Sequence, residues 1–103
     1  MSYREVMALP TLAALEEYVR QVLCQENQWE PAATRLTRLP IRRGPHLCGY
    51  FLQLRGPKNL KCHAIWAEAE HRVLFYDTSG SRFAQVRLSE APALTGAGTP
   101  PAV

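Results

Sequence analysis

The sequence predicts an α+β fold in which an N-terminal amphipathic helix packs on a curled, five-stranded antiparallel meander. A long segment near the N-terminus carries apolar residues at helical spacing. The chain then changes to short apolar runs separated by frequent turn signals. The connections between these runs are too short for crossover helices, so neighbouring strands should be antiparallel.

Two helical signals precede the strands. Ser2 followed by Glu5 has the form of a capping box, which predicts a short helix over 3–8 that Pro10 ends. The stretch TLAALEEYVRQVLCQEN then places an apolar stripe on one helical face: Leu12, Leu15, Val19, Val22 and Leu23. Cys24 lies about 180° from the centre of this stripe, at 100° per residue, and is expected to be exposed.

The strand region and the tail complete the predicted chain. The predicted strands are 35–43, 48–55, 60–68, 71–77 and 82–88. Pro40 marks the first of them as an edge strand or a bulged one, because proline cannot donate to a central ladder. Residues 90–103 are rich in proline, glycine and alanine, and we expect a disordered tail there. A single domain should therefore span 1–89.

The predicted strand register gives both sheet faces an apolar character. If the second hairpin turns on the four residues GPKN, Cys62 lies opposite Gln53. One face then carries Phe51, Ala64, Trp66, Val73, Phe75, Ala84, Val86 and Leu88. The other carries Tyr50, Leu52, His63, Ile65, Leu74, Tyr76 and Phe83.

One helix can cover only one of these faces. The second could be closed by curling of the sheet, by a second copy of the chain, by a partner or by a ligand. Tyr50, His63 and Tyr76 combine apolar bodies with polar tips, which suits an interface better than a sealed core. We therefore predict that this second face is a partner-binding surface, with a homodimer or a protein partner as its occupant.

Basic residues form a second candidate site. Residues 31–89 carry ten basic and three acidic side chains, whereas residues 1–30 carry two and five. Two hairpin turns at the same end of the meander should gather the cations Arg55, Lys58, Lys61 and Arg82 beside the backbone donors of Ser79, Gly80 and Ser81. Such a cluster could bind an anion such as a phosphate, or nucleic acid without sequence specificity.

The residues that carry metal or catalytic chemistry do not converge. The predicted register separates Cys48 from Cys62 by five positions, roughly 17 Å, which exceeds a disulfide or one zinc shell. Cys62 should lie near Asp77, whose carboxylate would raise rather than lower a thiol pKa. No nucleotide-binding, zinc-protease or nucleophile-elbow motif occurs. We therefore expect no cofactor, no metal and no enzymatic activity.

Composition restricts the class of protein further. The chain has 103 residues, 47% apolar and 20% charged, as an ordinary globular domain does. It has no apolar run long enough to cross a bilayer and no signal peptide. Three cysteines, an odd number, argue for reduced thiols. We expect a cytoplasmic, non-enzymatic binding or adaptor protein; the alternative is a nucleic-acid or anionic-ligand binder that uses the basic hairpin ends.

Overall fold

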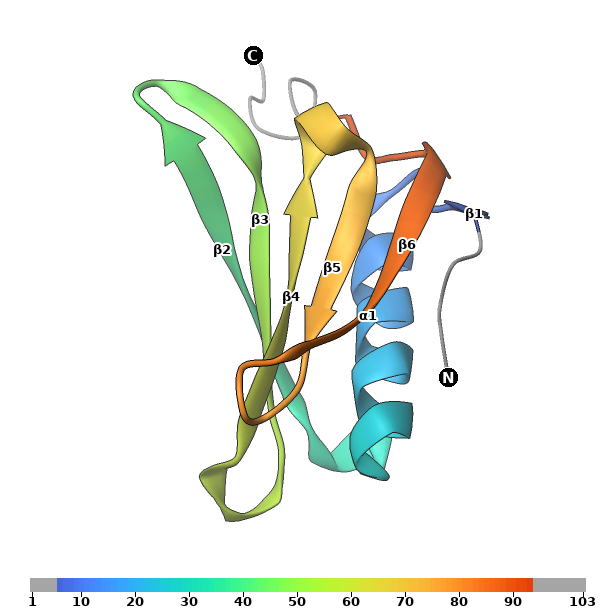
Figure 1. Ribbon diagram of the computed structural model, residues 1–103, viewed down its shortest axis with the longest axis vertical. Helices are drawn as coiled ribbons and strands as arrows, with labels where there is room; N and C mark the ends of the chain where they lie inside the picture. The colour runs from blue at the N-terminus through green and yellow to red at the C-terminus, as the bar shows by residue number, and fades with distance from the viewer. Residues whose placement is uncertain (1–5, 94–103) are drawn as a thin grey trace.

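A computed structural model describes residues 6–93 and shows an α+β arrangement, one helix on a mixed six-stranded sheet (Figure 1). The helix is α1 (Leu12–Asn27). The strands are β1 (Val6–Ala8), β2 (Arg35–Arg43), β3 (His46–Arg55), β4 (Lys61–Ala67), β5 (Arg72–Tyr76) and β6 (Arg82–Glu90). Single 3-10 turns η1 (Pro31–Ala33), η2 (Pro57–Asn59) and η3 (Glu68–Glu70) lie in three of the connections. The long helix and the five strands from β2 to β6 match the sequence prediction.

The sheet is mixed, which corrects the predicted five-stranded antiparallel meander. Its strand order is β1-β6-β5-β4-β3-β2, and β2 to β6 pair antiparallel in sequence order as expected. The sixth strand, β1, pairs parallel to β6 through Val6 opposite Arg87 and Met7 opposite Leu88. The helix predicted over 3–8 is therefore wrong for Val6–Ala8, while residues 3–5 lie outside the described part.

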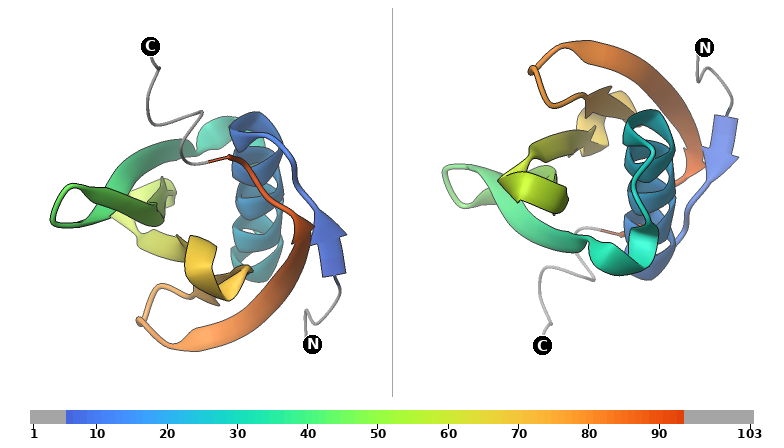
Figure 2. Two further views of the ribbon diagram at one scale, coloured as in Figure 1. Left: turned by 90° about the horizontal axis from the view of Figure 1, so that it is seen from above. Right: turned by 90° about the horizontal axis from the view of Figure 1, so that it is seen from below.

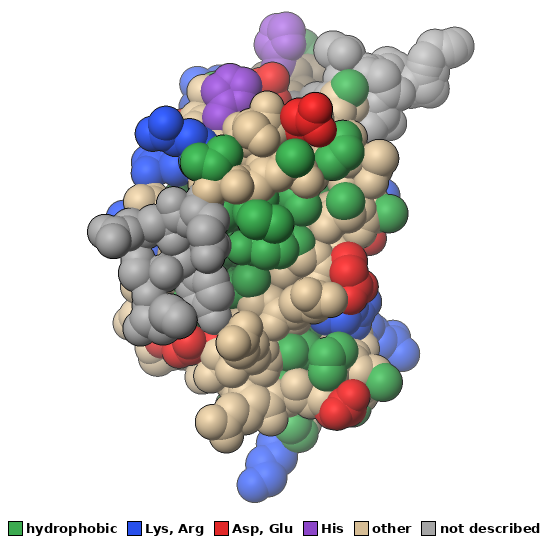
Figure 3. All heavy atoms as spheres, turned by 90° about the vertical axis from the view of Figure 1, so that its right-hand side faces the viewer, with side chains coloured by type: hydrophobic (Ala, Val, Ile, Leu, Met, Phe, Trp, Pro, Cys, Tyr) green, Lys and Arg blue, Asp and Glu red, His purple; other side chains and the backbone are tan. Residues whose placement is uncertain are grey.

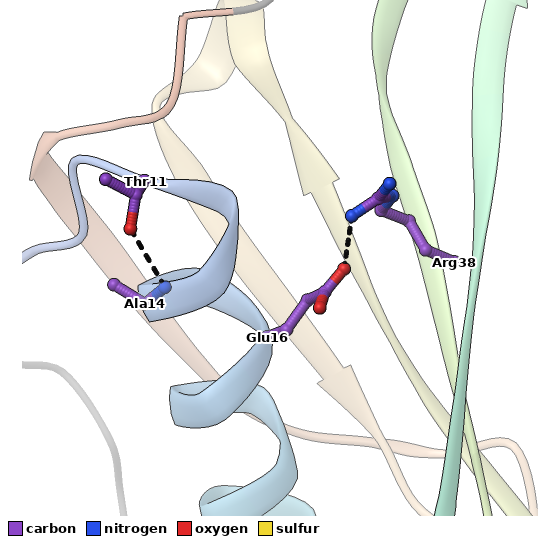
Figure 4. Close-up of polar contacts among 4 residues, drawn as sticks. All are labelled: Thr11, Ala14, Glu16 and Arg38. Carbon is purple, nitrogen blue, oxygen red and sulfur yellow. Dashed lines mark hydrogen bonds and ion pairs between the residues drawn. The ribbon is translucent and has the colours of Figure 1, made fainter. Parts of the chain in front are cut away.

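Helix α1 begins and ends at identifiable residues. Thr11 is the N-cap, and its hydroxyl accepts a hydrogen bond from the Ala14 backbone N–H at 3.1 Å (Figure 4). The helix ends at Asn27, and its C-cap residue Gln28 adopts the left-handed conformation with φ 59°. The predicted apolar stripe faces the sheet, where Leu15, Val19 and Leu23 are fully buried.

The sheet curves around α1, so that one of its faces is concave and the other convex (Figure 2). The concave face holds the core with α1: Leu52, Leu54, Cys62, Ala64, Trp66, Val73, Phe75 and Val86 are all buried there. Arg38 reaches from β2 across this side to Glu16 of α1 and forms an ion pair (Figure 4). This ion pair fastens the edge strand β2 to the helix. The Arg38 guanidinium also lies 5.2 Å from the centroid of the Tyr50 ring on the neighbouring strand β3.

Pro40 lies in β2, which is an edge of the sheet, as its lack of an N–H predicts. The register of β2 shifts between Ile41 and Arg42. At the other end of the chain, β6 continues to Glu90, so the first residue of the predicted tail belongs to the sheet. Residues 91–93 of the predicted tail are described and have no regular secondary structure, and residues 94–103 lie outside the described residues. No helix within 6–93 is long and apolar enough to span a bilayer.

Candidate functional site

The β3–β4 hairpin sets which side chains reach the convex face. Its loop has three residues, not four: the Gly56 N–H donates to the Leu60 carbonyl at 2.9 Å, and Lys58 and Asn59 both have φ 59°. Cys62 therefore lies opposite Leu54, one position away from the predicted partner. A shift of one residue moves every side chain of a strand to the other face.

Three of the seven predicted partner-binding residues lie with the core, Tyr50 and Leu52 because of this shift and Phe83 because of a bulge. Tyr50 is 7% exposed and Leu52 is 0% exposed, both on the concave face. Phe83 is the extra residue of a bulge where Phe75 pairs with Ala84 but Tyr76 pairs with Arg82. Its ring lies 6.2 Å from that of the buried Phe75, and it packs against the core. The placement of these three residues on the open face is wrong.

The other four predicted residues, His63, Ile65, Leu74 and Tyr76, do lie on the convex face. The pairing aligns them with residues that the sequence reasoning missed. The first row, which we call the apolar row, is Leu39, Phe51, Ile65 and Leu74, with Gln85 at its end. Leu39 in this row is 51% exposed, and the other apolar members are half-buried. Leu39 and Phe51 could have been found only from the correct register.

The second row, which we call the aromatic row, is Thr37, Gln53, His63, Tyr76 and Arg82. The rings of His63 and Tyr76 stack at 4.6 Å between centroids and 13° between planes. Phe51, from the apolar row, stacks on the other side of His63 at 4.9 Å and 27°. Burial lowers the pKa of His63 below its ordinary value, so the imidazole between these rings is neutral at pH 7.

The third row, which we call the cationic row, is Arg35, Arg55 and Lys61, directly opposite one another on three adjacent strands. The sequence reasoning identified Arg55 and Lys61 and missed Arg35. Arg82 lies in the aromatic row beside Tyr76, and Lys58 lies in the η2 loop. The predicted cations therefore share one end of the sheet (Figure 1), where the β3–β4 and β5–β6 turns both lie.

The DTSGS turn does not offer the backbone donors that the phosphate hypothesis required. Oδ1 of Asp77 accepts hydrogen bonds from the backbone N–H of Ser79 at 2.9 Å and of Ser81 at 3.0 Å. The Ser79 hydroxyl donates to the same oxygen at 2.7 Å, and the Gly80 N–H donates to the Asp77 carbonyl. These bonds, chiefly that of the Ser79 hydroxyl, lower the pKa of Asp77. The chain's own carboxylate occupies the place where an anion was expected.

The cysteines lie in the core and at its margin. Cys24 is 2% exposed, which corrects its predicted exposure: the η1–β2 segment passes over the far side of α1, and Cys24 Sγ lies 4.0 Å from Thr34 Oγ1. Burial, with smaller contributions from Cys24 and Asp77, raises the pKa of Cys62 to about 12, although Asn27 donates to its sulfur. The Cys62 thiol is therefore protonated at neutral pH and is a poor nucleophile. Within the described residues, no group of three or more potential metal ligands comes together.

A shallow hollow opens at the opposite end of the convex face, lined by Val6, Arg72, Gln85, Val86 and Arg87. Arg72 donates to Gln85 Oε1 at 2.8 Å and pairs with Glu70 at 2.9 Å. Arg87 lies opposite Arg72 on β6. Arg72 and Arg87 thus lie in the row next to the apolar row on one side, while on the other side the aromatic row, with Arg82 at its end, separates the apolar row from the cationic row.

The comparisons with known proteins give no relative for this arrangement. No protein family model matches the sequence, and neither a curated protein nor a solved structure is significantly similar to it.

Proposed function

We propose that this chain is a small, non-enzymatic binding or adaptor module that acts through the convex face of its sheet, on a protein partner or on a second copy of itself. The observation that carries this proposal is the apolar row with its aromatic neighbours, which no helix of residues 6–93 covers. Contiguous apolar side chains on an uncovered sheet face are typical of interaction sites.

The side chains that could serve catalysis have structural roles instead, which supports a non-enzymatic function. Cys62 is buried and protonated, while Asp77 and Ser79 are bonded to each other inside a turn. The three cysteines form no disulfide with one another in the structure, which agrees with the cytoplasmic location that is part of this proposal.

The alternative function is binding of nucleic acid or another anionic ligand at the basic hairpin end. The cationic row favours it, because three adjacent cations create a positive field. The loss of the turn donors to Asp77 weakens the phosphate-loop form of this alternative, so that only the side-chain cations support it.

The test compares two leucine-to-glutamate variants. Leu74→Glu places a charge in the apolar row, whereas Leu60→Glu changes an exposed leucine, 45% accessible, at a position on the other side of the β3–β4 hairpin. Quantitative affinity capture from cell extract, with light scattering for self-association, should show partners or dimers lost with Leu74→Glu and kept with Leu60→Glu. Equal behaviour of the two variants would refute the convex face as the binding surface.

A further inference from the structure

The charges of the convex face all have the same sign. The four paired rows on this face comprise the apolar, aromatic and cationic rows and the row that contains Arg72 and Arg87. Their charged members are Arg35, Arg55, Lys61, Arg72, Arg82 and Arg87, and none of the paired positions is a carboxylate. Figure 3 shows the contrast on the side that carries β1 and α1, where acidic and basic side chains are interspersed.

The cationic row has no compensation within the described chain. The ion pairs among residues 6–93 are Arg38 with Glu16 and Arg72 with Glu70. Like charges at directly opposed positions of neighbouring strands destabilise a sheet. Arg35, Arg55 and Lys61 therefore repel one another in the isolated chain, and an anionic occupant would relieve this repulsion.

An apolar stripe accompanies these charges. The apolar row crosses four strands, a span of about 14 Å at about 4.8 Å per strand. Same-face rows are about 7 Å apart along the strands. Arg72 and Arg87 lie beside the apolar row on one side, and because Arg72 already pairs with Glu70, Arg87 is the cation that is left for an occupant there. Arg82 lies more distantly on the other side, where the cationic row follows. An occupant must therefore combine an apolar stripe with negative charge on both sides of it.

A second copy of this chain does not meet that requirement. In a two-fold interface the same surface contacts itself. Whichever way the two faces are turned, the cationic row lies against another cationic border, and the paired rows hold no carboxylate. The Glu70 carboxylate beside the Arg72 border already pairs with Arg72.

Single-stranded nucleic acid fits less well than an acidic protein. Its bases bind by stacking on the faces of aromatic rings. Here Phe51, His63 and Tyr76 stack on one another across the strands, so both faces of the central ring are already covered. The aliphatic side chains Leu39, Ile65 and Leu74 offer no stacking surface.

We propose that the convex face binds an acidic amphipathic protein segment, whose apolar stripe lies on the apolar row and whose carboxylates pair with the flanking cations. This inference rests on the proposed function and specifies the partner class for the same surface. A helix about 10–12 Å in diameter has a suitable width to lie along the apolar row and reach the arginines beside it. Helix-in-groove docking of this kind is a recurrent mode of peptide recognition.

A display selection tests the inference with defined probes. A library of randomised helical peptides is selected for binding to the full chain and counter-selected against the Leu74→Glu variant. Circular dichroism checks that this variant is folded. Tyr76→Ala serves as a second variant of the convex face. We expect the surviving peptides to carry Asp and Glu on both sides of an apolar stripe. Their affinity should fall a few-fold with Arg55→Glu, and it should also fall at high salt, since exposed charge pairs are weak and are screened by salt.

Arg43→Glu is the matched control, because Arg43 is an exposed cation at the far end of β2. It should leave the affinity of the selected peptides unchanged. A labelled single-stranded oligothymidylate, measured by fluorescence anisotropy on the same variants, tests the nucleic-acid alternative.

Each of the other outcomes contradicts the inference, and together they show whether the proposed function fails with it. Peptides that require Leu74 but carry neutral or basic flanks would refute the acidic partner and leave the proposed function standing. Arg55-dependent binding of the oligonucleotide that is tighter than that of any peptide would replace the protein partner with nucleic acid. If no peptide survives counter-selection and no oligonucleotide binds, both the inference and the proposed function fail.

Discussion

The concave and convex faces of the sheet both carry apolar side chains but differ in what surrounds them. On the concave face, α1 and the ends of the sheet enclose Trp66 and Phe75 completely. On the convex face, Ile65 and Leu74 are half-buried among their neighbours, and every charged residue of the paired rows is a cation. Hydrophobicity alone therefore does not distinguish the face that stabilises the fold from the face available to a partner; the distinction lies in coverage and charge.

Two adjacent aromatic residues test this contrast most strongly. Phe75→Ala should lower the free energy of unfolding by about 3–5 kcal/mol, because it leaves a cavity in the core. Tyr76→Ala, one residue along β5 and on the convex face, should cost about 1 kcal/mol, mainly the stacking on His63. Urea denaturation measures both, and equal losses would show that the two faces contribute equally to stability.

Gly49 tests how tightly the far end of the sheet is packed. A Cβ at this position would lie 1.9 Å from the backbone oxygen of Trp66, so β3 and β4 would have to separate. Gly49→Ala should therefore cost about 2 kcal/mol. Gly44→Ala is an informative comparison, because no atom lies within 4 Å there and the cost should come from its positive φ alone. Differential scanning calorimetry of the two variants would contradict this account if Gly49→Ala were neutral.

The N-cap of α1 tests how much this helix, which covers the concave face, depends on its capping hydrogen bond for stability. Thr11→Ala removes the acceptor for the Ala14 N–H and should lower the free energy of unfolding by about 1 kcal/mol. Thr11→Ser keeps the hydroxyl and should restore most of that loss. Thermal denaturation distinguishes the two, and an unchanged melting temperature for Thr11→Ala would exclude the cap as a source of stability.

The cationic row predicts a small effect of opposite sign. Arg55→Gln removes the central charge between Arg35 and Lys61, and it should raise the free energy of unfolding by about 0.5 kcal/mol at low salt. The gain should shrink as salt screens the repulsion. A destabilised Arg55→Gln would mean that the row is already neutralised, and would remove one argument for an anionic partner.

The DTSGS turn predicts the smallest effect, seen in pH dependence. Hydrogen bonds lower the pKa of Asp77 in the folded chain, so its stabilising contribution is present above its unfolded pKa, about 3.9, and is lost as the pH falls through the folded value. The stability difference between wild type and Asp77→Asn should therefore narrow in acid. A difference that stays constant from neutral pH to strong acid would contradict this assignment.

Local patterns predicted the elements well and their long-range pairing less well. The helical stripe and the turn spacing were sufficient to predict α1 and the strands β2 to β6, and Pro40 indicated the edge. The three-residue strand β1 was missed because its parallel partner, β6, lies at the other end of the chain. A stretch this short carries no periodicity that favours a strand over a helix turn.

The candidate site depended on a single residue of loop length. Reading GPKN as a four-residue turn shifted β3 by one position, which exchanged Phe51 with Tyr50 and Leu52 between the faces. The left-handed conformations of Lys58 and Asn59 that close the shorter loop are uncommon for residues other than glycine. Asparagine adopts this conformation more often than most residues, but lysine does not, so the sequence did not indicate that Lys58 would adopt it. Phe83 was misplaced because of a bulge in β6, and Cys24 was misplaced because the segment between η1 and β2 passes over the helix. Neither feature can be predicted from a local pattern.

The most direct test of the account is the free energy of unfolding of Leu74→Glu, measured by urea denaturation beside Leu52→Glu. The two leucines lie on opposite faces of the same sheet, Leu74 on the convex face and Leu52 on the concave face. If the convex face is free for a partner, Leu74→Glu stays within about 1 kcal/mol of wild type while Leu52→Glu fails to fold. A loss for Leu74→Glu as large as that for Leu52→Glu would show that the convex face is packed within the folded protein, and would contradict its proposed role as a binding surface.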